Sequence, residues 1–127
     1  MKNNLRTLFT IAVFCLALGA AVSAFGQIKT GGYRAVSVSD QGVTDAADFA
    51  LEIKASEMDE ELSLESIVKA ETQVVAGTNY RLCLEIYVPA KEEETDGVTL
   101  YIQTVIFRSL KNEYSIKSWE ESDCGGK

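Results

Sequence analysis

The chain has 127 residues, 12 basic and 19 acidic residues, a net charge of −7, and no histidine. This length allows one domain with a single core. The acidic balance excludes a surface for nucleic acid or for an anionic membrane. Without histidine the chain cannot build the Ser-His or Cys-His pairs of hydrolytic enzymes, and no CxxC, HExxH or phosphate-binding Gly loop occurs. We therefore predict that the protein is not an enzyme, has no catalytic residues, and needs no cofactor or metal ion.

Residues 1–26 have the pattern of a signal peptide. Lys2 and Arg6 supply the positive start, and an apolar run covers residues 8–22. The run is shorter than the roughly 20 residues that a membrane-spanning helix needs. We therefore expect an exported protein, secreted or periplasmic, that leaves the membrane once the signal is cleaved.

Cleavage after Ala24 or after Gly26 fits the small residues at this point. The second site leaves residues 27–127 as the mature domain. Loss of the leader reduces the basic residues to 10 against 19 acidic ones, so the mature net charge is −9. We interpret this charge mainly as a source of solubility.

Residues 40–60 are predicted to form the one helix, after an extended lead-in over residues 28–40. Asp40 is placed as the N-cap, where its carboxylate accepts from N–H groups two or three residues on. The apolar spacing predicts an inward face that holds Ala46, Phe49, Ala50 and Ile53. The solvent-exposed face is expected to hold Asp45, Asp48, Glu52 and Lys54.

Four strands are predicted after the helix, because apolar and β-branched residues recur there with a period of two. They cover residues 63–75, 79–88, 98–107 and 114–119. A charged loop, residues 89–97, separates the middle two. The inward positions are expected to be purely apolar, namely Leu82, Leu84, Ile86, Leu100 and Ile102. The fold class is thus α+β, with one long helix packed on a four- to five-stranded antiparallel sheet.

Two cysteines remain after cleavage, Cys83 and Cys124. An even number in an exported domain favours a disulfide between them, worth roughly 4 kcal/mol for a loop of this length. Cys83 falls on the more polar side of its strand, and Cys124 lies in a Gly-rich tail. Two free thiols or a disulfide-linked dimer are the alternatives.

The turn between the first two predicted strands is unusually apolar. It reads Gln73-Val74-Val75-Ala76-Gly77, where turns are normally built from polar residues and glycine. Uncovered apolar side chains at a hairpin tip indicate a contact surface. Gly77 supplies the positive φ that a tight hairpin demands.

This turn resembles the QxVxG motif of the cystatins, reversible protein inhibitors of papain-like cysteine proteases. The longer string TQVVAGTNY, residues 72–80, is similar to the stefin branch. Residues 47–51, ADFAL, resemble the helix motif of the plant members, with Asp48 in place of an Arg-type residue. The resemblance covers residues 31–120 and implies the cystatin fold.

The resemblance also implies a tripartite wedge that binds the protease. Its first piece is the amino-terminal segment at Gly31 and Gly32, and its second is the turn of residues 73–77. The third is the second hairpin, where the string FRSL resembles the stefin variant and places Ser109 and Leu110 at the contact in place of Pro-Trp.

The function implied is reversible, competitive inhibition of papain-like cysteine endopeptidases by occlusion of the active-site cleft. We expect a monomer, with a dimer as the alternative. The alternative function is a non-inhibitory exported binding module on the same fold.

Overall fold

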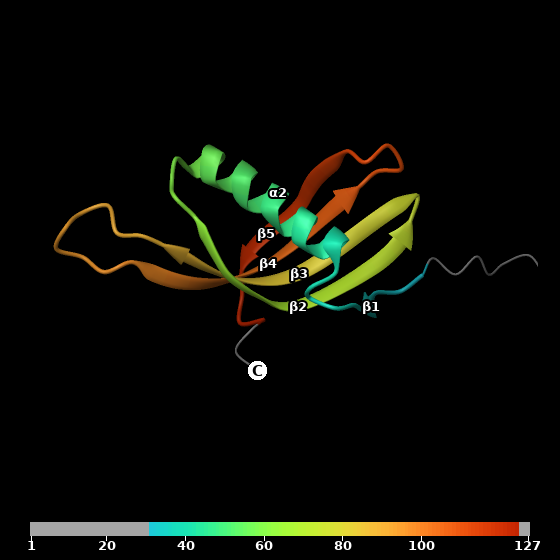
Figure 1. Ribbon diagram of the computed structural model, residues 1–127, viewed down its shortest axis with the longest axis horizontal. Helices are drawn as coiled ribbons and strands as arrows, with labels where there is room; N and C mark the ends of the chain where they lie inside the picture. The colour runs from blue at the N-terminus through green and yellow to red at the C-terminus, as the bar shows by residue number, and fades with distance from the viewer. Residues whose placement is uncertain (1–30, 125–127) are drawn as a thin grey trace, which may run out of the picture.

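The computed structural model describes residues 31–124 of the chain, so the predicted signal peptide lies outside the described residues. The elements, in chain order, are β1 (Arg34–Ala35), α2 (Gln41–Met58), β2 (Ser63–Val75), β3 (Gly77–Val88), β4 (Val98–Arg108) and β5 (Tyr114–Glu121). All neighbouring strands pair antiparallel in the order β1-β2-β3-β4-β5. Helix α2 lies across one face of this sheet (Figure 1). The predicted α+β architecture is confirmed.

Helix α2 begins where the sequence predicts. The Oδ1 atom of Asp40 accepts hydrogen bonds from the N–H groups of Gly42 (2.9 Å) and Val43 (3.3 Å). The helix ends at Met58, and Asp59 follows in the left-handed conformation at φ 50°. No helix in residues 31–124 is long and apolar enough to cross a membrane.

The buried face of α2 includes Ala46 and Ala50, as predicted, with Phe49 packed against the core, but it differs from the prediction at Ile53. Its buried residues are Val43, Ala46, Ala47, Ala50 and Leu51. Ile53, predicted to point inward, is 36% exposed. Small alanines let the helix approach the sheet closely, and Ile53 lies about a quarter turn from the centre of this stripe.

Lys54, predicted on the solvent-exposed face, is half-buried instead. Its Nζ lies 5.9 Å from the ring centroid of Trp119 and 3.1 Å from Glu57. The long aliphatic stem covers apolar surface while the charge stays near solvent. Asp45, Asp48 and Glu52 are exposed, as predicted.

The core lies between α2 and the central strands. Leu82, Leu84, Ile86 and Ile102 are buried, as predicted, while Leu100 is half-buried. The prediction that no polar group lies inside is wrong, since Thr104 is fully buried. Its Oγ1 donates to the carbonyl of Ser118 at 2.7 Å, which offsets the cost of burying a hydroxyl.

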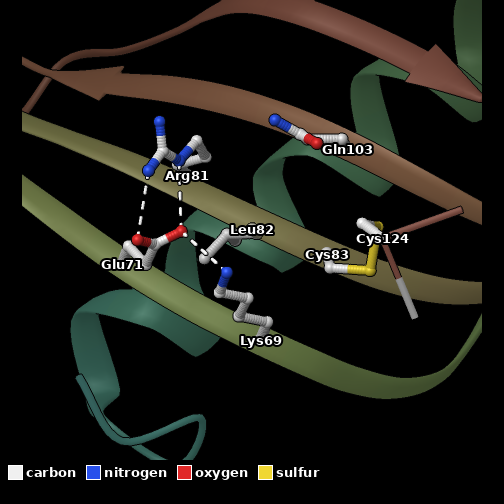
Figure 2. A pocket seen from close by; sticks show the side chains of 7 residues that line it. All are labelled: Lys69, Glu71, Arg81, Leu82, Cys83, Gln103 and Cys124. Carbon is white, nitrogen blue, oxygen red and sulfur yellow. Dashed lines mark hydrogen bonds and ion pairs between the residues drawn. A yellow bond between two sulfur atoms is a disulfide. The ribbon is translucent and has the colours of Figure 1, made fainter. Parts of the chain in front are cut away.

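A disulfide joins Cys83 to Cys124 on the face of the sheet away from α2 (Figure 2). After β5, the chain turns back across β4, and the N–H of Ser122 donates to the carbonyl of Tyr101 at 2.9 Å. The tail thus reaches β3 and covers Cys83, which is buried even though it points away from the helix.

Candidate functional site

The three segments predicted to bind a protease meet at one end of the sheet. Figure 1 shows the β2–β3 turn, the β4–β5 turn and the amino-terminal segment together at its right side. We call residues 31–35, 73–79 and 107–113 the wedge end. A groove of about 280 Å³ lies between the two turns, lined on one side by Val74 and Val75 and on the other by Ser109 and Leu110.

The β2–β3 turn exposes the apolar side chains that the sequence places there. Val74 is 72% exposed, and Val75 and Ala76 are exposed as well. The strand register pairs Val75 directly with Gly77, so the chain reverses within one residue. These side chains protrude because a reversal this tight leaves them no neighbour to pack against.

Gln73 stabilises the hairpin from within. It is half-buried, and its Oε1 accepts a hydrogen bond from Nδ2 of Asn79, the residue opposite it on β3, at 3.0 Å. The amide therefore braces the base of the turn and holds the exposed valines in one position.

Gly77 is buried, so it shapes the turn and presents no surface of its own. Its φ is 123°, in the region that favours glycine. A Cβ at this position would collide with the carbonyl oxygen of Arg108 and lie 2.7 Å from the ring of Phe107. The glycine thus lets the first hairpin pack against the second.

The β4–β5 turn projects one apolar side chain, Leu110, which is 81% exposed. Ser109 braces this turn, and the protease contact predicted for it stays a prediction. Its Oγ accepts hydrogen bonds from the N–H groups of Lys111 (3.2 Å) and Glu113 (3.1 Å). Asn112 closes the turn with a positive φ of 61°. These hydrogen bonds therefore fix the backbone of the turn that carries Leu110.

The amino-terminal segment is anchored just after its glycine pair. The ring of Tyr33 lies 3.9 Å from the guanidinium carbon of Arg81, and β1 pairs with β2 immediately afterwards. Gly31 and Gly32 are exposed. A Cβ on Gly31 would lie 3.7 Å from the carbonyl oxygen of Val74, which places this segment beside the first turn.

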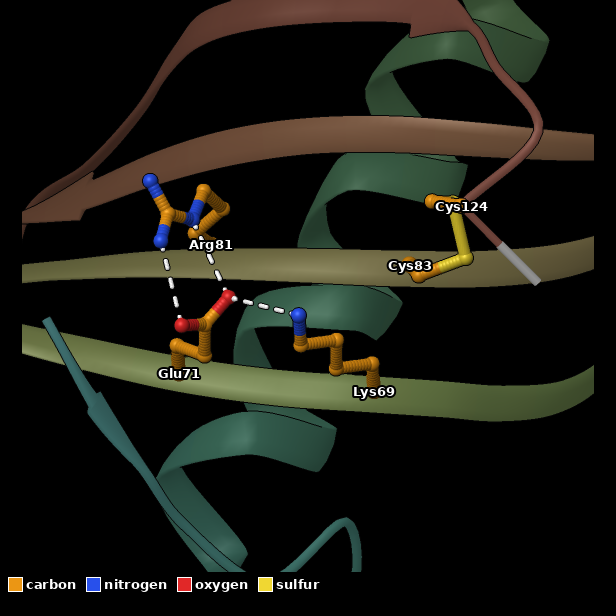
Figure 3. Close-up of polar contacts among 5 residues, drawn as sticks. All are labelled: Lys69, Glu71, Arg81, Cys83 and Cys124. Atoms are coloured by element: carbon orange, nitrogen blue, oxygen red, sulfur yellow. Dashed lines mark hydrogen bonds and ion pairs between the residues drawn. A yellow bond between two sulfur atoms is a disulfide. The ribbon is translucent and has the colours of Figure 1, made fainter. Parts of the chain in front are cut away.

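Arg81 is itself held by an ion pair on the outer face of the sheet (Figure 3). Its Nε and one terminal nitrogen donate to the two carboxylate oxygens of Glu71, both at 3.1 Å, and Lys69 lies 3.6 Å from the same carboxylate. The hydrogen bond from Arg81 is the main reason that the pKa of Glu71 is lowered.

Sequence reasoning missed the support that Tyr80 provides beneath the wedge end. Tyr80 is buried, the guanidinium of Arg108 lies 5.4 Å from its ring, and burial raises its pKa. A Cβ on Gly42 would collide with its hydroxyl, so this glycine lets the start of α2 reach the wedge end. The strand period marks Tyr80 as inward-facing, but it carries no sign of the helix that covers it.

The described part of the chain contains no group of three or more Cys, Asp or Glu placed to hold a metal ion. The chemistry of the wedge end is instead that of a contact surface: protruding apolar side chains on backbone held by hydrogen bonds.

Comparison with known proteins places the chain in a family. A family model described as "Aspartic acid proteinase inhibitor" matches residues 35–122. "Salivary cystatin-L2" of Ixodes scapularis is 31% identical, over 87% of this chain and 95% of that protein. The chain belongs to the cystatin superfamily.

Other cystatin relatives agree in sequence and in fold. "Cysteine proteinase inhibitor 1" of Actinidia chinensis var. chinensis is 39% identical over 46% of this chain, and the match spans 51% of that protein's length. Dimeric human cystatin F has the same fold, with a TM-score of 0.64 at 17% identity, over 81% of this chain and 95% of that structure. Membership of this family confirms the predicted cystatin fold and the prediction that the protein is not an enzyme.

Proposed function

We propose that this cystatin is a reversible, competitive protein inhibitor of papain-like cysteine endopeptidases. The observation that carries the proposal is the placement of Val74 and Leu110, two strongly exposed apolar side chains, on neighbouring turns at one end of the sheet. An exposed apolar protrusion of this kind is stabilised when a cleft covers it. The name of the Actinidia relative, "Cysteine proteinase inhibitor 1", supports a cysteine protease as the target.

Inhibition would follow from occlusion of the cleft. The two turns enter the active site and cover its catalytic Cys and His, and no peptide bond of the inhibitor takes the attacking geometry, so nothing is cleaved. Gln73, Gly77 and Ser109 hold the turns in shape before binding. A preformed surface loses little conformational freedom on binding, which favours affinity.

The amino-terminal segment supplies the third contact. Gly31 lies beside the first turn. Together with Gly32 it lets the chain approach the protease backbone without a Cβ in the way. Tyr33, held by Arg81, fixes the point from which this segment departs.

The experiment is an inhibition assay against papain, with pepsin and trypsin measured in parallel. We expect inhibition of papain that added substrate relieves. Pepsin is included because the matching family model names aspartic proteinases, and inhibition of pepsin alone would replace the proposed target class. If none of the enzymes is inhibited, the protein is a non-inhibitory binding module.

The assay is repeated with the double variant V74S/L110S. Both side chains are exposed, so we expect melting to remain unchanged and papain inhibition to be lost. The matched control is Val38→Ser, which removes another exposed valine outside the wedge end and should inhibit like the parent.

We further propose that residues 1–26 direct export and are removed, so that the inhibitor acts outside the cytoplasm. The name of the Ixodes scapularis relative, "Salivary cystatin-L2", favours secretion. Mass spectrometry of the exported protein should show a chain that begins at Phe25 or Gln27. A chain that keeps Met1 would contradict this.

A further inference from the structure

The end of the molecule opposite the wedge end carries an apolar pocket of about 250 Å³. It lies between the last turn of α2 and the sheet beneath it. Its lining is mostly apolar and includes Leu62, Ile86, Val88, Leu100, Ile102 and Trp119. Met58 and Val98, also in the lining, are 45% and 53% exposed. A single-domain protein with one core gains nothing from leaving Met58 and Val98 uncovered.

The pocket is open because the sheet extends beyond the end of the helix. Helix α2 ends at Met58, whereas β3 and β4 continue beyond it to the loop of residues 89–97 (Figure 1). The period of two carries Ile86, Val88 and Leu100 along the same face that α2 covers elsewhere. Ile86 is still buried, but past the end of the helix no element covers Val88 and Leu100 fully, and both are half-buried.

A second hollow adjoins this pocket and shares Glu60, Pro89 and Ala90 with it. It is further lined by Asp59, Glu61 and Lys91. Asp96 lines the apolar pocket itself. An apolar space thus opens directly beside a group of carboxylates.

The charge around this pocket is strongly one-sided. We call residues 57–61 and 89–98 the distal end. It has eight acidic residues and one basic residue, a net charge of −7: Glu57, Asp59, Glu60, Glu61, Glu92, Glu93, Glu94 and Asp96 against Lys91. Lys91 lies 3.4 Å from Glu60 and so neutralises only one of them. Lys54, the other cation nearby, is already paired with Glu57.

We propose that the distal pocket is a second docking site, which binds a basic segment of a partner protein. An apolar side chain of that segment fills the pocket, and its lysine or arginine neighbours lie against the carboxylates of the distal end. The charge selects this partner, because an acidic or neutral segment would gain only the apolar contact. The wedge end stays free, so one molecule can hold a protease and a basic partner at once.

Trp119 gives a direct readout of binding. It is the only tryptophan in the chain, it lines the pocket, and it is half-buried. The probes are three twelve-residue peptides: lysine-rich with two central leucines, lysine-rich with two central serines, and glutamate-rich with two central leucines. We expect only the first to shift the emission of Trp119 saturably, with at least tenfold weaker binding when salt rises from 50 to 500 mM.

Three results would overturn the proposal. Equal binding of both leucine peptides would show an apolar pocket that does not select charge. No change in emission with the basic leucine peptide up to millimolar concentration would show that the pocket accepts no such segment. Sedimentation of the protein alone is measured as well, because Arg108, Leu110 and Lys111 of a second copy have the same chemistry as the probe. Self-association that the peptide reverses would replace the foreign partner with a second copy.

Val98→Arg places a positive charge at the mouth of the pocket on a side chain that is already exposed. We expect at least tenfold weaker peptide binding, an unchanged melting temperature and unchanged papain inhibition. Val38→Arg is the matched control, an exposed valine outside the pocket, and should bind the peptide like the parent. The docking site does not depend on the proposed inhibition, since V74S/L110S should lose papain inhibition and keep peptide binding.

Discussion

The wedge end and the distal end use one sheet to build opposite kinds of apolar surface. At the wedge end, Val74 and Leu110 protrude from tight turns, and the charge is +2, with Arg34, Arg108 and Lys111 against Glu113. At the distal end, the apolar residues form a hollow and the charge is −7. A protrusion fits into a cleft, whereas a hollow accepts a side chain. The two ends therefore suit different partners, because they differ in both shape and charge.

The position of α2 along the sheet explains the difference. Asp40 caps the helix close to the wedge end, and Tyr80 and Gly42 bring its first turn against the sheet there. The core under the wedge turns is therefore complete. The helix stops at Met58, short of the loop between β3 and β4, and leaves the sheet uncovered.

The largest effect on stability is expected from the double variant C83A/C124A. The disulfide closes a loop with a sequence separation of 41, so its loss should lower the free energy of unfolding by about 4 kcal/mol. Urea denaturation of parent and variant measures this. Both ends should still bind at a temperature where the variant is folded, because neither contains the disulfide. Loss of papain inhibition by the folded variant would show that the wedge end depends on the tail.

A second prediction concerns Gly77, which joins the two turns of the wedge end. Gly77→Ala should cost about 1–3 kcal/mol of stability, since φ is 123° and the new Cβ meets Arg108 and Phe107. Papain inhibition should fall in the same variant, while the distal end should keep peptide binding. Gly32→Ala is the control for stability alone, because nothing in the protein lies within 4 Å of a Cβ there. Equal melting of Gly77→Ala and the parent would contradict the packing described for the two hairpins.

A smaller effect, on papain inhibition alone, is expected from substitution of Leu110 at the wedge end. Leu110→Ala should weaken papain inhibition about tenfold, roughly 1.4 kcal/mol, and leave melting unchanged, because the side chain is exposed. Leu110→Trp should tighten binding by adding aromatic area. The inhibition constants and melting temperatures of both variants and of the parent test these two expectations. A large drop in melting temperature for Leu110→Ala would place the residue in the core instead.

The smallest effect is the pH dependence that Glu71 contributes. Its pKa is lowered in the folded protein, chiefly by the hydrogen bond from Arg81. The pair therefore stabilises the fold above the pKa of the unfolded carboxyl, and this is lost as the pH falls through the folded pKa. Because the pair is partly exposed, we expect no more than about 1 kcal/mol.

The test compares the parent with Glu71→Gln in urea denaturation between about pH 5 and pH 2. The parent should lose more stability over this range than the variant. Parallel curves would show that the ion pair contributes nothing. Loss of the Glu71–Arg81 ion pair at low pH should affect the amino-terminal segment more than the rest of the wedge end, because Arg81 also contacts Tyr33.

Much of the fold could be predicted from the sequence, because the periods of helix and strand are local properties. The predicted helix over residues 40–60 and the predicted strands lie within a few residues of the observed elements. The orientation of α2 about its axis could not be predicted. It depends on which helix residues are small enough to approach the sheet, and Ile53 and Lys54 were misplaced for this reason.

The location of the wedge end could be predicted from the sequence. The structural roles of several of its residues could not. The apolar turn at residues 73–77 stands out in the sequence. The bracing roles of Gln73, Gly77 and Ser109 depend on contacts with Asn79, Arg108 and Glu113 that only the folded hairpins create.

Two further features could not be predicted from local patterns. The buried hydroxyl of Thr104 donates to the carbonyl of Ser118, next to a β-bulge that the strand period does not reveal. The distal pocket arises from the difference in length between α2 and the strands under it, which is a property of the assembled layers.

The most direct measurement of the central claim is a calorimetric titration of the protein into papain, with free enzyme and with enzyme whose cleft is filled by a covalent peptide inhibitor. If the wedge end occupies the cleft, free papain should bind one molecule of the protein and release it intact, and the filled enzyme should show no binding. Equal binding to both forms of the enzyme would contradict the account, because the contact would then lie outside the cleft.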